Sequence, residues 1–107
     1  MDVSRLRKEY EEEGIDSANA LGDPMEQFKI WYVQAKEAMI PEPDAAVIAS
    51  VNEEEYPSSR FVLVRKVDGD GFVFFTNYRS DKATSFSLSP KVSLTFGWLP
   101  LHRQVRV

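Results

Sequence analysis

One stretch decides the fold: Arg60-Phe-Val-Leu-Val-Arg-Lys-Val-Asp-Gly-Asp-Gly-Phe-Val-Phe-Phe-Thr76. Two runs rich in valine and phenylalanine flank Asp-Gly-Asp-Gly, which is typical of the tight turn of a β-hairpin. The stretch therefore predicts strands at 60–67 and 72–76, joined by a turn at 68–71. Strict alternation along the first strand predicts two faces: Arg60, Val62, Val64 and Lys66 on one, and Phe61, Leu63 and Arg65 on the other.

Further elements are predicted on both sides of this hairpin. Short apolar runs indicate strands at 45–51, 92–98 and 104–107, and a short helix is expected at 80–88. Upstream, Asp23 is a suitable N-cap and Pro24 suits the first position of a second helix. A weaker periodic pattern predicts another helix at 2–13. The second helix has apolar residues every three or four positions: Met25, Phe28, Tyr32, Ala35 and Met39.

The order of these elements predicts an α+β domain. Two N-terminal helices precede a largely antiparallel meander with one short inserted helix, which forms a small sheet or an incomplete barrel. We divide the chain into a helical segment at 1–43 and a sheet portion at 44–107. Because the last strand runs to Val107 without a following turn or cap, we expect this chain to be part of a longer protein.

Composition excludes several function classes. The 107 residues suit one domain, and the absence of cysteine excludes disulfides, zinc–thiolate sites, iron–sulfur clusters and a cysteine nucleophile. The single histidine, His102, cannot build a multi-histidine metal site and makes Ser-His-Asp catalysis a poor hypothesis. No apolar run approaches the ~20 residues of a membrane span. We therefore expect a cytoplasmic protein with no metal, no membrane partner and no residue acting as a catalytic nucleophile.

Charge is distributed unevenly along the chain. Residues 1–55 hold 5 Lys or Arg against 14 Asp or Glu, whereas residues 56–107 hold 8 against 3. An anionic ligand is therefore expected in the second half, although a chance distribution of solvated charge explains composition alone as well. The overall isoelectric point near 5.0 argues against general nucleic-acid binding.

Three clusters in the basic half could carry chemistry. Cations at 60, 65 and 66 share one strand, where a phosphate would give them a partner, although an ordinary edge strand with solvated cations is the better explanation of this cluster alone. The segment 74–82 leads from aromatic residues to a helix N-terminus with Lys82, an arrangement that favours phosphate but also fits a capped helix beside a core. Gln104 offers a donor and an acceptor to the edge of a heteroaromatic ring.

Taken in order, these segments resemble the pyridoxamine (pyridoxine) 5′-phosphate oxidase family. The resemblance covers nearly the whole chain, and the fixed order of several motifs is more specific than any one of them. The matching stretches are Leu6-Arg-Lys-Glu-Tyr10, Asp23-Pro24, Gln27-Phe28, Trp31, Pro41-Glu-Pro43, Pro57-Ser-Ser-Arg60-Phe-Val-Leu63, Gly71-Phe-Val-Phe-Phe-Thr-Asn77, Ser80 with Lys82, and Trp98 followed by Arg103-Gln-Val-Arg-Val107.

The resemblance implies an FMN-binding split β-barrel, here incomplete, that works as a homodimer with FMN at the subunit interface. It implies oxidation of pyridoxamine or pyridoxine 5′-phosphate to pyridoxal 5′-phosphate, with O₂ as the electron acceptor. It also assigns residues by position. Cofactor contacts are Arg60, Phe61, Val62, Leu63, Val64, Arg65, Phe75, Thr76, Lys82 and Gln104, and substrate contacts are Arg7, Lys8, Glu9, Tyr10 and Arg65.

Two positions depart from the family pattern. Arg65 stands where the family usually has lysine, and Asp81 stands where it usually has an arginine on the FMN phosphate. A planar guanidinium is not equivalent to an ammonium, and a carboxylate reverses the charge. These departures leave open a non-catalytic or truncated protein that binds flavin or vitamer phosphate on the same fold. A third reading, a split-barrel flavin reductase acting on another substrate, is disfavoured by the match at 7–10.

Overall fold

The computed structural model describes residues 1, 15, 19–75 and 90–107. Its elements are α1 (Pro24–Glu37), β1 (Ala45–Val51), β2 (Pro57–Asp68), β3 (Gly71–Phe74), β4 (Ser93–Trp98), the short 3₁₀ turn η2 (Leu99–Leu101) and β5 (Arg103–Arg106). The described part of the chain thus has one α-helix where two N-terminal helices were predicted. The helices predicted at 2–13 and 80–88 lie outside the described residues.

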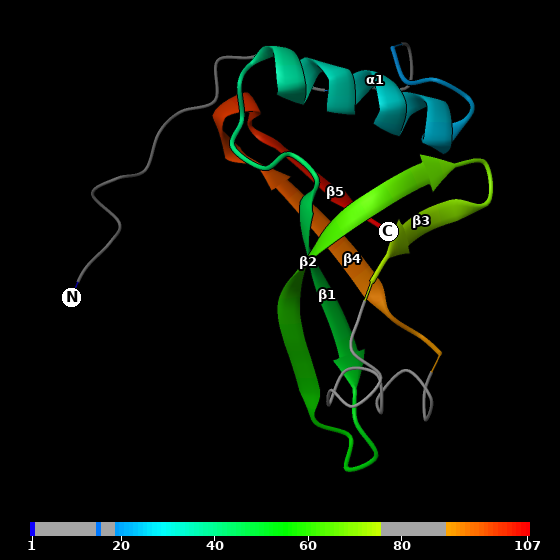
Figure 1. Cartoon of the computed structure of the whole chain (residues 1–107), viewed down its shortest axis with the longest axis vertical. Coiled ribbons are helices and arrows are strands. Elements are labelled where there is room, and N and C mark those ends of the chain that lie inside the picture. The colour runs from blue at the N-terminus through cyan, green and yellow to red at the C-terminus, as the bar shows by residue number, and fades with distance from the viewer. Residues whose placement is uncertain (2–14, 16–18, 76–89) are drawn as a thin grey trace.

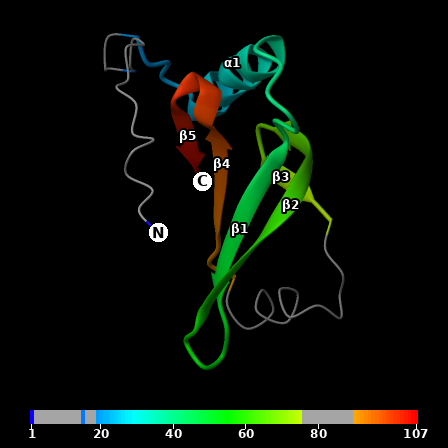
Figure 2. The same ribbon diagram turned by 90° about the vertical axis from the view of Figure 1, so that its left-hand side faces the viewer.

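The strands form one open antiparallel sheet in the order β3-β2-β1-β4-β5. The prediction of a meander is right for β1, β2 and β3 but wrong for β4, which pairs with the opposite edge of β1. Helix α1 lies across one face of the sheet, while the β1–β2 hairpin extends away from the helix (Figures 1 and 2). We call the face toward α1 the inner face and the opposite face the outer face.

Helix α1 begins as predicted and ends earlier than predicted. The Asp23 carboxylate accepts a 2.9 Å hydrogen bond from the Met25 amide, with Pro24 at the first helical position. At the other end Met39 adopts a left-handed conformation (φ 57°), and its amide and that of Ile40 donate to carbonyls of the last turn. This Schellman arrangement places Met39 in solvent and buries Ile40 instead. Met39 is therefore not part of the apolar helix face.

The core is centred on Phe28 of α1. Its ring lies 5.0 Å from that of Phe72 in an edge-on contact, 4.9 Å from Phe96 and 5.6 Å from Trp98, measured between centroids. Offset and edge-on aromatic contacts add to the gain from burial. The buried Trp98 indole also donates a 3.0 Å hydrogen bond to the Pro43 carbonyl. One helical side chain thus connects α1 with β3 and β4, so the helix and the described strands share this core.

A bulge at Arg65 changes the predicted faces of β2. Val62 and Val64 are buried as alternation predicts, but the register shifts between Val64 and Lys66. The extra residue turns Val67 toward the core and leaves the Lys66 side chain in solvent, 3.3 Å from the Asp68 carboxylate. The prediction that Lys66 faces the same side as the two valines is therefore wrong. The register pairs Val64 with Phe74, Lys66 with Val73, and Val67 with Phe72.

The predicted turn at 68–71 joins β2 to β3. Asp68 accepts a 2.8 Å hydrogen bond from the Asp70 amide, and Gly71 has φ 141°, a conformation that side chains rarely adopt. The Asp70 amide, followed by the ammonium of Lys66, holds the pKa of Asp68 below its ordinary value. Among the described residues, no helix is long and apolar enough to cross a membrane.

Replacing Phe28 tests the centre of the core. Phe28→Ala removes the ring that joins α1 to two strands, and we expect it to lower the free energy of unfolding by about 3–5 kcal/mol. Phe28→Leu keeps most of the apolar volume and should cost clearly less. Urea denaturation followed by tryptophan fluorescence measures both changes. Equal, small losses in the two variants would contradict this role of Phe28.

Tyr32 supplies a pH-dependent contribution to stability. Burial raises the pKa of Tyr32 above its ordinary value of 10.0, and the nearby negative charge of Asp44 raises the pKa further. Above about pH 10 the unfolded chain loses this proton first, so the free energy of unfolding should fall as pH rises. The fall should be smaller in Tyr32→Phe, as measured by urea denaturation between about pH 8 and pH 11. Parallel curves for the two proteins would refute the assignment.

Candidate cofactor-binding face

The predicted cofactor residues of β2 lie on both faces of the sheet. Val62 and Val64 are buried on the inner face, so their side chains belong to the core. Phe61 and Leu63 point to the outer face, where the Phe61 side chain is 74% exposed and that of Leu63 is 37% exposed. The phenylalanine and the leucine can therefore meet a ligand through their side chains, whereas the Val64 amide already donates to the Asp44 carbonyl.

Strand register brings Gln104 to the same face as Phe61, although they are far apart in sequence. Val47 of β1 pairs with Phe61 on one side and with Thr95 of β4 on the other. Gln104 of β5 pairs with Gly97 of β4, two residues along from Thr95 and therefore on the same face. Because a side chain built at Gly97 would meet nothing within 4 Å, the space over this part of the outer face is open.

The first half of β2 has an uncovered edge. Strand β3 pairs with β2 from Val64 to Asp68, whereas residues 57–63 are paired by β1 on the other side. Within the described part of the chain, no strand covers that second edge of β2 before Val64. Phe75, which directly follows β3, is 77% exposed. Backbone groups of an open strand edge can hydrogen-bond a ligand, and the exposed side chains of Phe61 and Phe75 accompany this edge.

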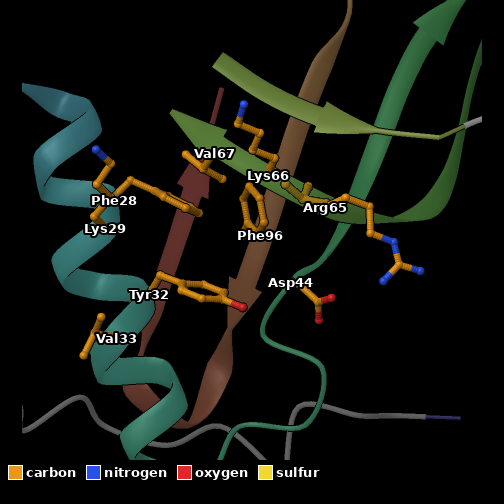
Figure 3. A pocket seen from close by; sticks show the side chains of 10 residues that line it. Phe28, Lys29, Tyr32, Val33, Asp44, Arg65, Lys66, Val67 and Phe96 are labelled. Carbon is orange, nitrogen blue, oxygen red and sulfur yellow. The ribbon is translucent and has the colours of Figure 1, made fainter. Parts of the chain in front are cut away.

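The two predicted arginines of β2 are exposed but differ in direction. Arg60 pairs with Ile48 near the end of the β1–β2 hairpin. Because it is two residues from Val62 on the same strand, it lies on the inner face as Val62 does. Arg65 occupies the bulge, and its guanidinium extends away from α1 (Figure 3). Neither arginine has a hydrogen-bond or ion-pair partner among the described residues. As far as the described residues go, both cations can therefore pair with an anionic group, at different points along the same strand.

A cavity of about 320 Å³ lies between α1 and β2, and nothing in the sequence patterns predicted it. Its base is apolar, whereas charged groups lie at its margin (Figure 3). The Tyr32 hydroxyl is directed toward the Asp44 carboxylate. Asp44 follows two prolines and has no periodic relation to the helix, which is why no sequence signal placed it near Tyr32. The lining is Phe28, Lys29, Tyr32, Val33, Asp44, Val64, Arg65, Lys66, Val67 and Phe96.

The remaining predicted site residues lie outside the described residues. They comprise the substrate segment and part of the phosphate-binding cluster: Arg7, Lys8, Glu9, Tyr10, Thr76 and Lys82. Asp81, the departure from the family pattern, belongs to the same group. Their roles therefore stay predictions.

The described residues fit a flavin mononucleotide. A flat ring system needs an apolar surface, and Phe61 and Leu63 expose one on the outer face. A polar ring edge needs donors and acceptors, which the Gln104 amide and the open edge of β2 can supply. A phosphate needs cations, and Arg60 lies on the strand that carries this edge. These features could hold the two chemically different ends of such a molecule.

Comparisons with known proteins agree with this fold. A family model described as pyridoxamine 5′-phosphate oxidase matches residues 32–107. A relative from Hydrogenovibrio crunogenus, named pyridoxine/pyridoxamine 5′-phosphate oxidase 2, is 45% identical over 107 residues, which are 100% of this chain and 50% of the relative. The chain thus spans about half the length of the curated relatives it matches.

Solved structures share the fold at lower sequence identity. PhzG from Burkholderia lata, solved with tetrahydrophenazine-1-carboxylic acid, has a TM-score of 0.80 at 23% identity, covering 84% of this chain and 45% of PhzG. A pyridoxamine 5′-phosphate oxidase-related, FMN-binding protein from Nostoc punctiforme has a TM-score of 0.67 at 19% identity, covering 78% of this chain and 44% of that protein. These likenesses show the fold, and the family model, which matches more than half of the chain, shows that the chain belongs to the pyridoxamine 5′-phosphate oxidase family.

Proposed function

We propose that this chain forms the FMN-binding half of an enzyme that oxidises pyridoxamine or pyridoxine 5′-phosphate to pyridoxal 5′-phosphate. In this reaction the substrate gives up two electrons and two protons, and O₂ takes them to become hydrogen peroxide. From the amine substrate, water then releases ammonia to leave the aldehyde. Bound FMN supplies the chemistry that passes the electrons from the substrate to O₂.

The observation that carries this proposal is the open edge of β2 beside the outer face. Residues 60–63, the first four of the segment 60–65 assigned to FMN, lie in the part of β2 that β3 leaves uncovered. An edge of this kind offers backbone groups to a ligand without disturbing the sheet. Relatives named as these oxidases are 45% and 46% identical to this chain over all of its 107 residues, and this similarity supports the proposed function.

The residues of this chain bind and orient the cofactor in this proposal. Arg60 pairs with the phosphate of FMN, Phe61 and Leu63 shield one side of the ring system from water, and Gln104 holds the polar edge of the ring. No side chain of the chain needs to act as a nucleophile, because the redox chemistry belongs to the cofactor. In this proposal Arg65, exposed at the bulge of the same strand, contacts both the flavin and the substrate.

We further propose that two copies of the chain assemble in the cytoplasm as a homodimer with FMN between them. The outer face carries exposed apolar side chains on neighbouring strands, and covering them removes apolar surface from water. The segment 7–10 is proposed to close over the substrate, with Tyr10 contacting it. Thr76 and Lys82 are proposed to complete the phosphate site.

A second candidate is a protein of the same fold that binds flavin or vitamer phosphate without catalysis. The Arg65 and Asp81 departures favour it, because each changes a position that the family uses for the cofactor or the substrate. The two candidates differ in turnover and not in binding.

Flavin content and peroxide production test the proposal. The full-length protein that contains this chain should be yellow when purified or after adding FMN, and it should release hydrogen peroxide when given pyridoxamine 5′-phosphate. Absorbance near the flavin bands and a coupled peroxidase assay measure the two properties. A flavin-loaded protein without turnover would favour the non-catalytic candidate, and a protein that ignores FMN would reject both.

Two substitutions separate the cofactor role from the substrate role. Arg60→Ala removes a charge-assisted contact to phosphate, so the dissociation constant for FMN should rise by roughly tenfold or more. Tyr10→Phe should leave the FMN affinity unchanged and raise KM for the substrate. Flavin fluorescence titration and steady-state kinetics give the two values. Equal loss of FMN from both variants would contradict this division of roles.

A further inference from the structure

Arg103 connects the edge strand β5 to helix α1. Its Nη1 donates a hydrogen bond to the Gln34 Oε1, and its guanidinium carbon lies 4.6 Å from the centroid of the Trp31 ring. A guanidinium over an indole face is attracted by the ring quadrupole, and the hydrogen bond fixes its direction within the plane. The two contacts come from one helix face, so together they hold the beginning of β5 against α1. We call Arg103, Gln34 and Trp31 the arginine clamp.

The clamp acts where β5 has few other restraints. Within the described part of the chain, β5 pairs with β4 and with no other strand. At its far end, Val107 and Leu94 exchange two backbone hydrogen bonds of 2.8 Å. At its near end, the chain enters β5 through His102 in a left-handed conformation (φ 52°). The clamp therefore restrains the end of β5 that follows an irregular turn.

Strand geometry links the clamp to Gln104. Successive side chains of a strand point to opposite faces, so Arg103 and Val105 point inward while Gln104 points to the outer face. Val105 contacts the core, and its β4 partner is the buried Phe96. Fixing the inward side chains on both sides of Gln104 sets the rotation of the strand about its own axis. That rotation determines where the Gln104 amide points.

We propose that Arg103 is a positioning residue that holds the Gln104 amide in the orientation needed for the flavin ring. The inference rests on the proposed function, in which Gln104 contacts FMN. Arg103 itself lies on the face away from the cofactor and does not touch it. Its contribution to FMN affinity therefore passes through Gln104, which makes the two residues energetically coupled.

The choice of arginine follows from the two contacts it makes at once. A lysine at 103 places one ammonium either over the Trp31 ring or beside the Gln34 amide, whereas the planar guanidinium makes both contacts together. Arg103→Lys should therefore restore the charge but only part of the FMN affinity. Arg103→Met keeps the aliphatic stem and loses both contacts.

A double-mutant cycle on the full-length protein tests the inference. In the wild-type background, Arg103→Met should raise the FMN dissociation constant by about fivefold to tenfold, a size usual for coupled residues. In a Gln104→Ala background, the same change should have little further effect, because the amide that Arg103 orients is gone. Gln34→Met, which leaves β5 unaltered, should reproduce part of the loss. Flavin fluorescence titration measures all of these constants.

A matched control distinguishes positioning from general stability. Lys36→Met removes a cation that also lies over an aromatic ring, 5.9 Å from the Tyr32 centroid, but Lys36 and Tyr32 both belong to α1, so this contact does not join the helix to a strand. It should leave the FMN affinity unchanged. The free energy of unfolding of every variant is measured by urea denaturation, and binding is measured where each variant is folded.

Each outcome decides between the proposals. Additive effects of Arg103→Met and Gln104→Ala would overturn the positioning role of Arg103 while leaving FMN binding intact. FMN binding that is indifferent to Gln104→Ala would also overturn it, because the contact it serves would be absent. A full-length wild-type protein that binds no FMN would overturn the proposed function together with this inference.

Discussion

The burial of Phe28 against the aromatic rings of the sheet is the interaction on which the rest of the structure depends. It brings α1 onto the inner face and ties β3 to β4, although these strands lie at different sides of β1. Since the helix covers the inner face, the apolar side chains that remain exposed on β2 gather on the outer face. The position of the candidate cofactor site thus follows from which face the helix occupies.

Local sequence signals predicted those elements whose causes are themselves local. The turn at 68–71 and the N-cap at Asp23 depend on side chains that contact backbone two residues away, so a short window of sequence contains all the partners. The bulge at Arg65 and the left-handed Met39 were missed for the opposite reason. Each is stabilised by burial of a later residue, Val67 or Ile40, which depends on the packed core.

The candidate site was predicted by the order of motifs and not by physical pattern. Alternation along β2 correctly separates Phe61 from Val62, but it says nothing about which strand neighbours the outer-face residues. Gln104 lies on the same face as Phe61 only because the chain passes from β3 to the other side of β1, where it forms β4. That connection depends on tertiary packing. Nor could periodicity predict the arginine clamp, because Gln34 and Trp31 resemble ordinary polar and apolar positions of a helix until β5 is placed beside them.

The charge asymmetry of the sequence acquires a physical meaning once partners are assigned. Lys66 lies beside Asp68, and the Arg103 guanidinium is engaged by α1, so neither cation is fully available to a ligand. Arg60 and Arg65 have no such partner among the described residues, and both lie on β2. Exposed cations on one strand repel each other weakly in water and gain most when an anion joins them. The phosphate-bearing ligand proposed along this strand would pair with two cations that have no partner in the described part of the chain.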